Sequence, residues 1–200
     1  MAPDRHNDRV TTNDAVDRDE PNDVYVLGQQ RLRGEVQLVA YDSQWQQDYV
    51  RVANIIRSVL GDQVGLLEHI GSTSVRGLSA KPIIDIVLAV PDSSDEKTYV
   101  APLETVGFVL TIREQEWFEH RLLKGPDVDI NLHVFSVGCP EIERNLRFRD
   151  WLRAHDDDRD LYERTKQELA SHDWEYVQQY ADAKSEVVEK ILARAEAATG

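Results

Sequence analysis

Residues 69–86, "HIGSTSVRGLSAKPIIDI", contain the most informative pattern of this sequence. The stretch begins with a loop of small residues from Gly71 to Ser74 and ends beside Asp85, a lone carboxylate in an apolar run. Glycine permits backbone angles that other residues avoid, and the N–H groups and hydroxyls of such a loop can hold a phosphate group. A tight turn has the same composition, so the loop alone does not establish a binding site.

Asp85 lies within residues 82–90, "PIIDIVLAV", which are apolar almost throughout. Such a run is typical of a strand in the interior of a sheet. A carboxylate is costly to bury there unless it meets a metal ion, a basic side chain or several N–H donors. The alternative is an aspartate at a strand end that is tied to a neighbouring loop.

A second polar pattern occurs in residues 128–135, "VDINLHVF". Side chains on a strand alternate between its two faces, so Asp129, Asn131 and His133 are expected on one face and apolar residues on the other. Three polar side chains on one face predict one wall of a site. A solvated Asp129 and a hydrogen-bonded structural His133 are the alternatives.

The flanking sequence predicts a single domain of mixed strands and helices. Alternation or short apolar runs predict strands at 35–41, 65–70, 82–90, 108–113, 117–125 and 128–135. Helical spacing predicts helices at 42–61, 93–107, 141–155, 158–172 and 174–198. The interleaved order indicates an α+β fold whose C-terminal part is helical.

Composition excludes several classes of protein. The 200 residues are 41% hydrophobic, which is enough for a core, and carry a formal charge of −14 that argues against a broad nucleic-acid surface. No apolar run is long enough to cross a bilayer, and the single cysteine, Cys139, fits a reducing compartment. We expect a cytoplasmic protein with no membrane partner, and an acidic disordered tail over residues 1–33 ahead of a domain at 34–200. The oligomeric state stays open.

The stretch at 69–86 resembles the signature of the GrpB (UPF0157) family, HxGSTxVPGLxxKPxIDI, a branch of the nucleotidyltransferase superfamily. Further blocks of the resemblance follow in order, namely "HRLLKG" at 120–125, "LHV" at 132–134, "FRDWLRAH" at 148–155 and "YADAK" at 180–184. The resemblance covers residues 36–195. It implies a nucleotidyltransferase-like mixed β-sheet with flanking helices.

The resemblance also implies a site and a reaction. The expected reaction moves a nucleotidyl or phosphoryl group from a nucleoside triphosphate to a small-molecule or side-chain acceptor, with Mg²⁺ or Mn²⁺ as cofactor. Asp85, Asn131 and His133 would hold the metal ion, and Asp85, Lys81 and Arg149 would be catalytic. The predicted nucleotide-binding residues are Gly71, Ser72, Thr73, Ser74, Lys81, Arg121, Lys124 and Lys184.

The chain departs at one place from the pattern of the superfamily and at two places from the pattern of the GrpB family. The second acid of the first strand is replaced by Val87, the first histidine of a His-Leu-His pattern by Asn131, and the proline of the loop by Arg76. A nucleotide-binding or regulatory module without turnover is therefore the alternative function. A serine hydrolase that uses Ser72 or Ser74 is disfavoured, because the nucleophile-elbow pattern is missing.

Overall fold

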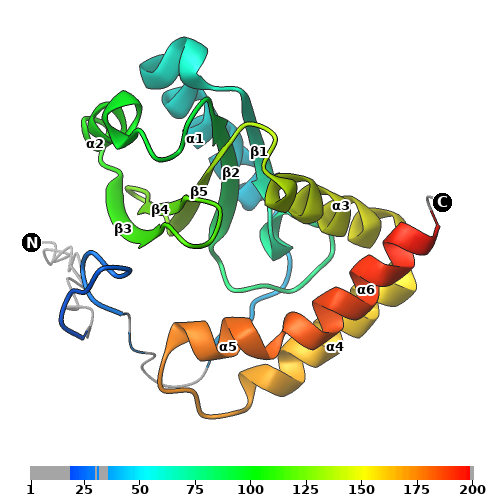
Figure 1. The fold of residues 1–200 in the computed structure, drawn as a ribbon. Helices are drawn as coiled ribbons and strands as arrows, with labels where there is room; N and C mark the ends of the chain where they lie inside the picture. The colour runs from blue at the N-terminus through cyan, green and yellow to red at the C-terminus, as the bar shows by residue number, and fades with distance from the viewer. Residues whose placement is uncertain (1–18, 30, 32–35, 199–200) are drawn as a thin grey trace, which may run out of the picture.

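The computed structural model describes residues 19–29, 31 and 36–198. Its centre is one five-stranded sheet in the order β1-β2-β5-β4-β3 (Figure 1). The strands are β1 (Leu66–Ile70), β2 (Ile84–Val90), β3 (Val109–Glu114), β4 (His120–Lys124) and β5 (Ile130–Ser136). β2 and β5 pair in parallel and the other neighbours pair antiparallel, so the sheet is mixed.

Six α-helices of the described chain flank the sheet, which confirms the predicted α+β class. They are α1 (Gln44–Leu60), α2 (Val100–Glu104), α3 (Pro140–Ala154), α4 (Asp156–Ala170), α5 (Val177–Ala183) and α6 (Ser185–Ala197). Short 3₁₀ turns occupy Gly61–Gln63, Ser72–Ser74 and Glu96–Thr98. In Figure 1, α4, α5 and α6 form a helical part beside the sheet, joined to it by α3. None of the described helices is long and apolar enough to cross a membrane.

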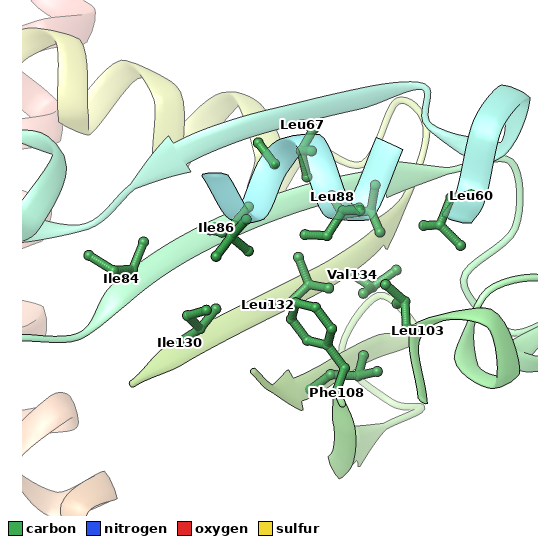
Figure 2. Close-up of a cluster of buried hydrophobic side chains, with 14 of the residues drawn as sticks. Leu60, Leu67, Ile84, Ile86, Leu88, Leu103, Phe108, Ile130, Leu132 and Val134 are labelled. Atoms are coloured by element: carbon green, nitrogen blue, oxygen red, sulfur yellow. The ribbon is translucent and has the colours of Figure 1, made fainter. Parts of the chain in front are cut away.

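One face of the sheet carries the main hydrophobic core (Figure 2). Alternate residues of β2 and β5 point into it, and α1 and α2 cover it because their apolar stripes face the sheet. The central side chains are Ile56, Ile84, Ile86, Leu88, Leu103, Phe108, Ile130, Leu132 and Val134. Burial of this layer is the main source of stability.

The opposite face of the sheet is only partly covered. Val87, Ala89 and Phe135 pack against Ile142 of α3 in a second, smaller cluster. The same strand faces continue toward the beginning of β2 and β5 with Asp85 and Asn131. Polar side chains thus occupy the part of this face that α3 leaves free.

A third apolar cluster joins the helical part to the loop after β1. Leu78 of the loop packs with Leu152 of α3, Tyr162 of α4 and Ile191 of α6. The glycine-serine loop is consequently held between the sheet and α4, and the position of α4 determines which side chains meet the loop.

Three predicted elements differ from the structure. The expected strand at 35–41 is not formed over its described residues, since only Val39 makes an isolated bridge, with Ala80. The expected helix at 93–107 shortens to a 3₁₀ turn and α2, because Pro102 has no N–H and is tolerated only in a first helical turn. The expected helix at 174–198 divides at Lys184, whose N–H donates to the carbonyl of Ala181 three residues back.

Part of the predicted tail contacts the domain. Val26 donates its N–H to Thr111 O at 2.9 Å, and Arg113 donates to Val24 O at 2.9 Å, so this segment lies along β3. Val26 is partly buried against the main core, which explains why the segment packs there. Residues 1–18, 30 and 32–33 of the predicted tail lie outside the described residues.

Candidate functional site

A cavity of about 750 Å³ opens on the polar part of the sheet, between the loop after β1 and helices α4 and α5. Four of the six lysines of the protein line it, namely Lys81, Lys124, Lys166 and Lys184. Among the described residues that line it, Asp85 and Asp129 are the only carboxylates. In a chain of charge −14, this concentration of ammonium groups gives the cavity a locally positive charge.

The glycine-serine loop forms one wall of the cavity. Gly71 has a positive φ of 67°, which favours glycine, and the loop then enters the 3₁₀ turn Ser72–Ser74. Ser74 donates its hydroxyl to Gly71 O at 2.6 Å, and Thr73 donates its hydroxyl to Ile83 O at 2.9 Å. These two hydroxyls hold the loop in shape, whereas the hydroxyl of Ser72 lies against a lysine of the cavity, Lys166.

Asp85 and Asn131 are opposite each other in the parallel register of β2 and β5. Asn131 donates its Nδ2 to Asp85 Oδ1 at 2.7 Å, and His133 Nε2 lies 3.9 Å from the same oxygen. Burial favours a raised pKa for the Asp85 carboxyl, but His133, Asn131 and Lys184 outweigh it and hold this pKa below its usual value. The Oδ1 atom of Asn131 is buried and has no hydrogen-bond partner within the described chain.

A row of polar side chains continues from Asp85 across the sheet. His133 Nδ1 lies 3.1 Å from His120 Nε2, and His120 Nδ1 lies 2.7 Å from Glu114 Oε2. Burial lowers the pKa of His120 to about 4, so its imidazole is neutral and carries one N–H. If His120 donates that N–H to Glu114, Nε2 of His120 is left to accept a hydrogen bond from Nδ1–H of His133. The other ring nitrogen of His133, Nε2, faces Asp85.

The donors at this point suit one metal ion. Asp85, Asn131 and His133 offer a carboxylate oxygen, the unpartnered amide oxygen and an imidazole nitrogen, a set that fits Mn²⁺ better than Mg²⁺. Among the described residues, no group of three or more His, Cys, Asp or Glu side chains is placed to hold a metal ion. Val87, two residues after Asp85 on β2, is fully buried and apolar.

The cavity lysines approach from several elements. Lys81 and Lys184 lie over the ring of Tyr180, with Nζ 5.8 Å and 4.7 Å from its centroid. Burial lowers the pKa of Lys81, and the charges of Lys184 and Lys124 lower it further. Lys124 donates to Asp129 Oδ1 at 3.2 Å. Positive charges held this close to one another are stabilised by a bound anion.

Lys166 is a cavity residue that the sequence interpretation missed. It lies on α4, is only 2% exposed, and donates to Ser72 Oγ at 3.2 Å and to the carbonyl of Ser79. A signal was available, because Asp158, Tyr162 and Lys166 are spaced by four residues and form the buried face of α4. A lysine on the inner face of an amphipathic helix is rare and indicates a specific role.

Arg121 and Arg149 do not line the cavity, contrary to expectation. Arg121 follows His120 on β4, so strand alternation directs it to the other face, where it pairs with Glu96 at 2.7 Å. Arg149 donates to Glu68 at 2.8 Å and to the carbonyl of His69 at 3.0 Å. Both guanidinium groups are therefore occupied within the fold, and Arg149 supports the strand that leads into the loop.

The remaining predicted residues fall into two groups. Gly71, Ser72, Thr73, Lys81, Asp85, Lys124, Asn131, His133 and Lys184 all line the cavity. Ser74 does not, because it lies on the far side of the loop, where its carbonyl accepts hydrogen bonds from Arg153 at 2.9 and 3.2 Å. The structure thus brings together most of the residues that the resemblance implied.

The fold and site define an α+β domain with a mixed sheet and a lysine-rich cavity beside a glycine-serine loop. The chain belongs to the GrpB family, since the profile of the family described as GrpB protein matches residues 35–194. The UPF0157 protein BH1888 of Halalkalibacterium halodurans is 60% identical over 81% of this chain and 83% of its own length. The UPF0157 protein SCO7215 of Streptomyces coelicolor is 44% identical over 82% of this chain and 86% of its own length.

A solved structure shares the fold. The crystal structure of the conserved protein GrpB from Enterococcus faecalis superposes with a TM-score of 0.66 at 26% identity. The match covers 79% of this chain and 98% of that one. The architecture described above is therefore the architecture of this family.

Proposed function

We propose that this protein is a metal-dependent transferase that moves a nucleotidyl or phosphoryl group from a nucleoside triphosphate to a small-molecule or side-chain acceptor. The observation that carries the proposal is the gathering of four of the six lysines around Asp85 and the Ser72 loop in one cavity. A triphosphate carries about four negative charges near neutral pH, and closely spaced lysines are the matching partner for a polyanion. The acidic remainder of the chain argues against nucleic acid as the acceptor.

The residues divide into three roles under this proposal. Asp85, Asn131 and His133 would hold one Mn²⁺ or Mg²⁺, which supplies charge neutralisation at the phosphates when it is bound. Gly71 and Ser72 would orient a phosphate through the loop N–H groups and the Ser72 hydroxyl. The ammonium groups of Lys81 and Lys184 would stabilise negative charge on the leaving group.

The position of attack separates two versions of the reaction. The resemblance to nucleotidyltransferases favours attack at the α-phosphorus with release of pyrophosphate. Phosphoryl transfer would release a nucleoside diphosphate instead. Identification of the released product distinguishes them.

A nucleotide-binding module without turnover is the second candidate. It is favoured by the buried Val87 in place of the second acid and by the lack of a three-ligand acidic or histidine cluster in the described chain. This candidate predicts saturable nucleotide binding and no product after long incubation with Mn²⁺ or Mg²⁺.

The test measures the melting temperature of the protein with each nucleoside triphosphate, with and without Mn²⁺ or Mg²⁺. Binding at a hundredfold excess over Kd stabilises the folded state by about 2.7 kcal/mol, which a thermal shift detects. Asp85→Asn should keep the fold, because the side-chain oxygen of asparagine can still accept from Asn131, but should lose the metal-dependent part of the shift. The matched control is Asp62→Asn, in the exposed turn after α1. A metal-dependent shift that survives in Asp85→Asn would contradict the proposed site.

A further inference from the structure

The amine of Lys166 lies in an unusual environment for a lysine. Its side chain is 2% exposed and contacts no carboxylate in the described part of the chain. Nζ donates to Ser72 Oγ and to the carbonyl of Ser79, and lies 4.9 Å from the centroid of the Tyr162 ring. Burying an ammonium ion without a counter-ion is costly, and lysines in such sites relieve the cost by losing their proton.

The charged and titratable groups around Lys166 do not remove this cost. Lys184 lies nearby and repels a positive charge on Lys166. Glu163 is the acid that attracts it, but the carboxylate of Glu163 already accepts the N–H of Ser79 at 3.0 Å. Burial raises the pKa of the Tyr162 phenol to about 12, so this ring stays neutral. Burial, with the repulsion from Lys184, lowers the pKa of Lys166 to about 7.

We propose that Ser72 and Lys166 form a phosphate subsite of the cavity, and that Lys166 takes up one proton when a phosphate group enters it. The inference rests on the proposed function, because it assumes that the anion of the cavity is a nucleoside triphosphate or a similar polyphosphate. It assigns a role to a residue outside the motif blocks, and it couples ligand binding to protonation.

The hydrogen bonds around Nζ explain the coupling. When the amine is uncharged, it donates a hydrogen bond to the Ser79 carbonyl, and its lone pair can accept a hydrogen bond from the Ser72 hydroxyl. A phosphate beside Ser72 supplies the missing counter-charge, so the amine binds a proton and donates to Ser79 O, Ser72 Oγ and the ligand. The Ser72 hydroxyl is then free to donate to a phosphate oxygen. Above the pH at which the free amine loses its proton, the dissociation constant should therefore rise about tenfold per pH unit.

The test is calorimetric titration of the full chain with ATP and with inorganic tripolyphosphate near pH 8, without metal ions. Titrations in two buffers of different ionisation enthalpy report the number of protons taken up per ligand. For the wild type we expect an uptake approaching one proton. Lys166→Arg, whose guanidinium stays charged, should bind with almost no uptake, and Lys190→Arg on the surface of α6 is the matched control that should behave as the wild type.

Lys166→Met guards against failure of the arginine variant to fold. Methionine fills a similar volume without a charge, and we expect it to weaken binding and abolish proton uptake. Binding without proton uptake in the wild type, or unchanged uptake in Lys166→Arg or Lys166→Met, would overturn this inference and leave the proposed function standing. No binding of either ligand in these metal-free titrations would overturn this inference, whereas the proposed function is overturned only if the thermal shift with Mn²⁺ or Mg²⁺ is also absent.

Discussion

Gly71 lies directly against Asp85. A Cβ atom at position 71 would lie 2.9 Å from the Cβ of Asp85 and closer still to Oδ2 of the Asp85 carboxylate. The contact follows from the antiparallel register of β1 and β2, which pairs Ile70 with Asp85 and so brings the loop to the carboxylate. The glycine and the acid of the signature are therefore parts of one packing contact.

Gly71→Ala should accordingly disturb the site as well as the backbone. The positive φ of Gly71, combined with an extended ψ of −175°, costs about 1–3 kcal/mol for a residue with a Cβ, and the clash also displaces Asp85. We expect a lower unfolding free energy in urea and weaker metal-dependent nucleotide binding. Gly138→Ala is the control, because Gly138 has a φ of 83° and open space around it. This variant should be less stable but should bind nucleotide as the wild type does. Unchanged binding in Gly71→Ala would contradict the role of Asp85.

The cavity lysines should account for most of the affinity for a polyanion. Lys81→Ala and Lys184→Ala each remove one charge-assisted contact of about 1.5–3 kcal/mol, so Kd for ATP should rise by about tenfold or more. Lys97→Ala and Lys190→Ala change the net charge equally but lie outside the cavity, and should leave Kd within about twofold. Equal effects in all four variants would indicate a general charge effect instead of a site.

Arg149 should matter for stability and not for ligand binding. Arg149→Lys keeps the charge but cannot reproduce the guanidinium contacts to Glu68, His69 O and Asp150, and we expect a loss of about 2–3 kcal/mol in unfolding free energy. Arg147→Ala removes an exposed pair with Glu196 and should cost less than about 1 kcal/mol. A large rise in Kd for nucleotide in a stably folded Arg149→Lys protein would restore Arg149 to the site.

Two buried histidines should make the protein sensitive to mild acid. Burial lowers the pKa of His69 and of His120 to about 4 from an unfolded value of 6.5. Between these values the unfolded chain binds more protons, so stability present at pH 7 is lost as the pH falls from 6.5 toward 4.

Each histidine should account for about 2 kcal/mol of this loss at pH 5, measurable by urea unfolding at the two pH values. His120→Gln removes its share of the pH dependence even if the variant is less stable at pH 7. His172→Gln, at an exposed position, should leave the difference between pH 7 and pH 5 unchanged. The same pH dependence in His120→Gln as in the wild type would show that His120 is not the source.

Local patterns were sufficient to predict most of the secondary structure. The apolar run around Asp85 is β2, the alternating run around Asn131 is β5, and the polar side chains of both strands lie on one face as strand geometry requires. The prediction of a strand at 35–41 was wrong, because alternation of apolar and polar residues does not guarantee a neighbouring strand with which to form hydrogen bonds. Among its described residues, the isolated β-bridge between Val39 and Ala80 is the only backbone pairing of the β type.

The composition of the site was harder to predict. Arg121 and Lys124 are close in sequence, but three residues along a strand place them on opposite faces of the sheet, and only Lys124 reaches the cavity. Arg149 belongs to a motif block, yet its guanidinium is held by Glu68 and the His69 carbonyl. Membership of a motif does not reveal whether a side chain serves the ligand or the fold.

The motif blocks of the sequence were enough to identify the family, and spacing along single strands and helices was enough to predict the α+β class and the polar face of β5. Only the tertiary structure decided that Lys166 of α4 meets Ser72, that His120 connects Glu114 to His133, and that four lysines from separate elements share one cavity. These contacts join residues that are distant in the sequence, and they form where helices and strands pack to bury their apolar faces.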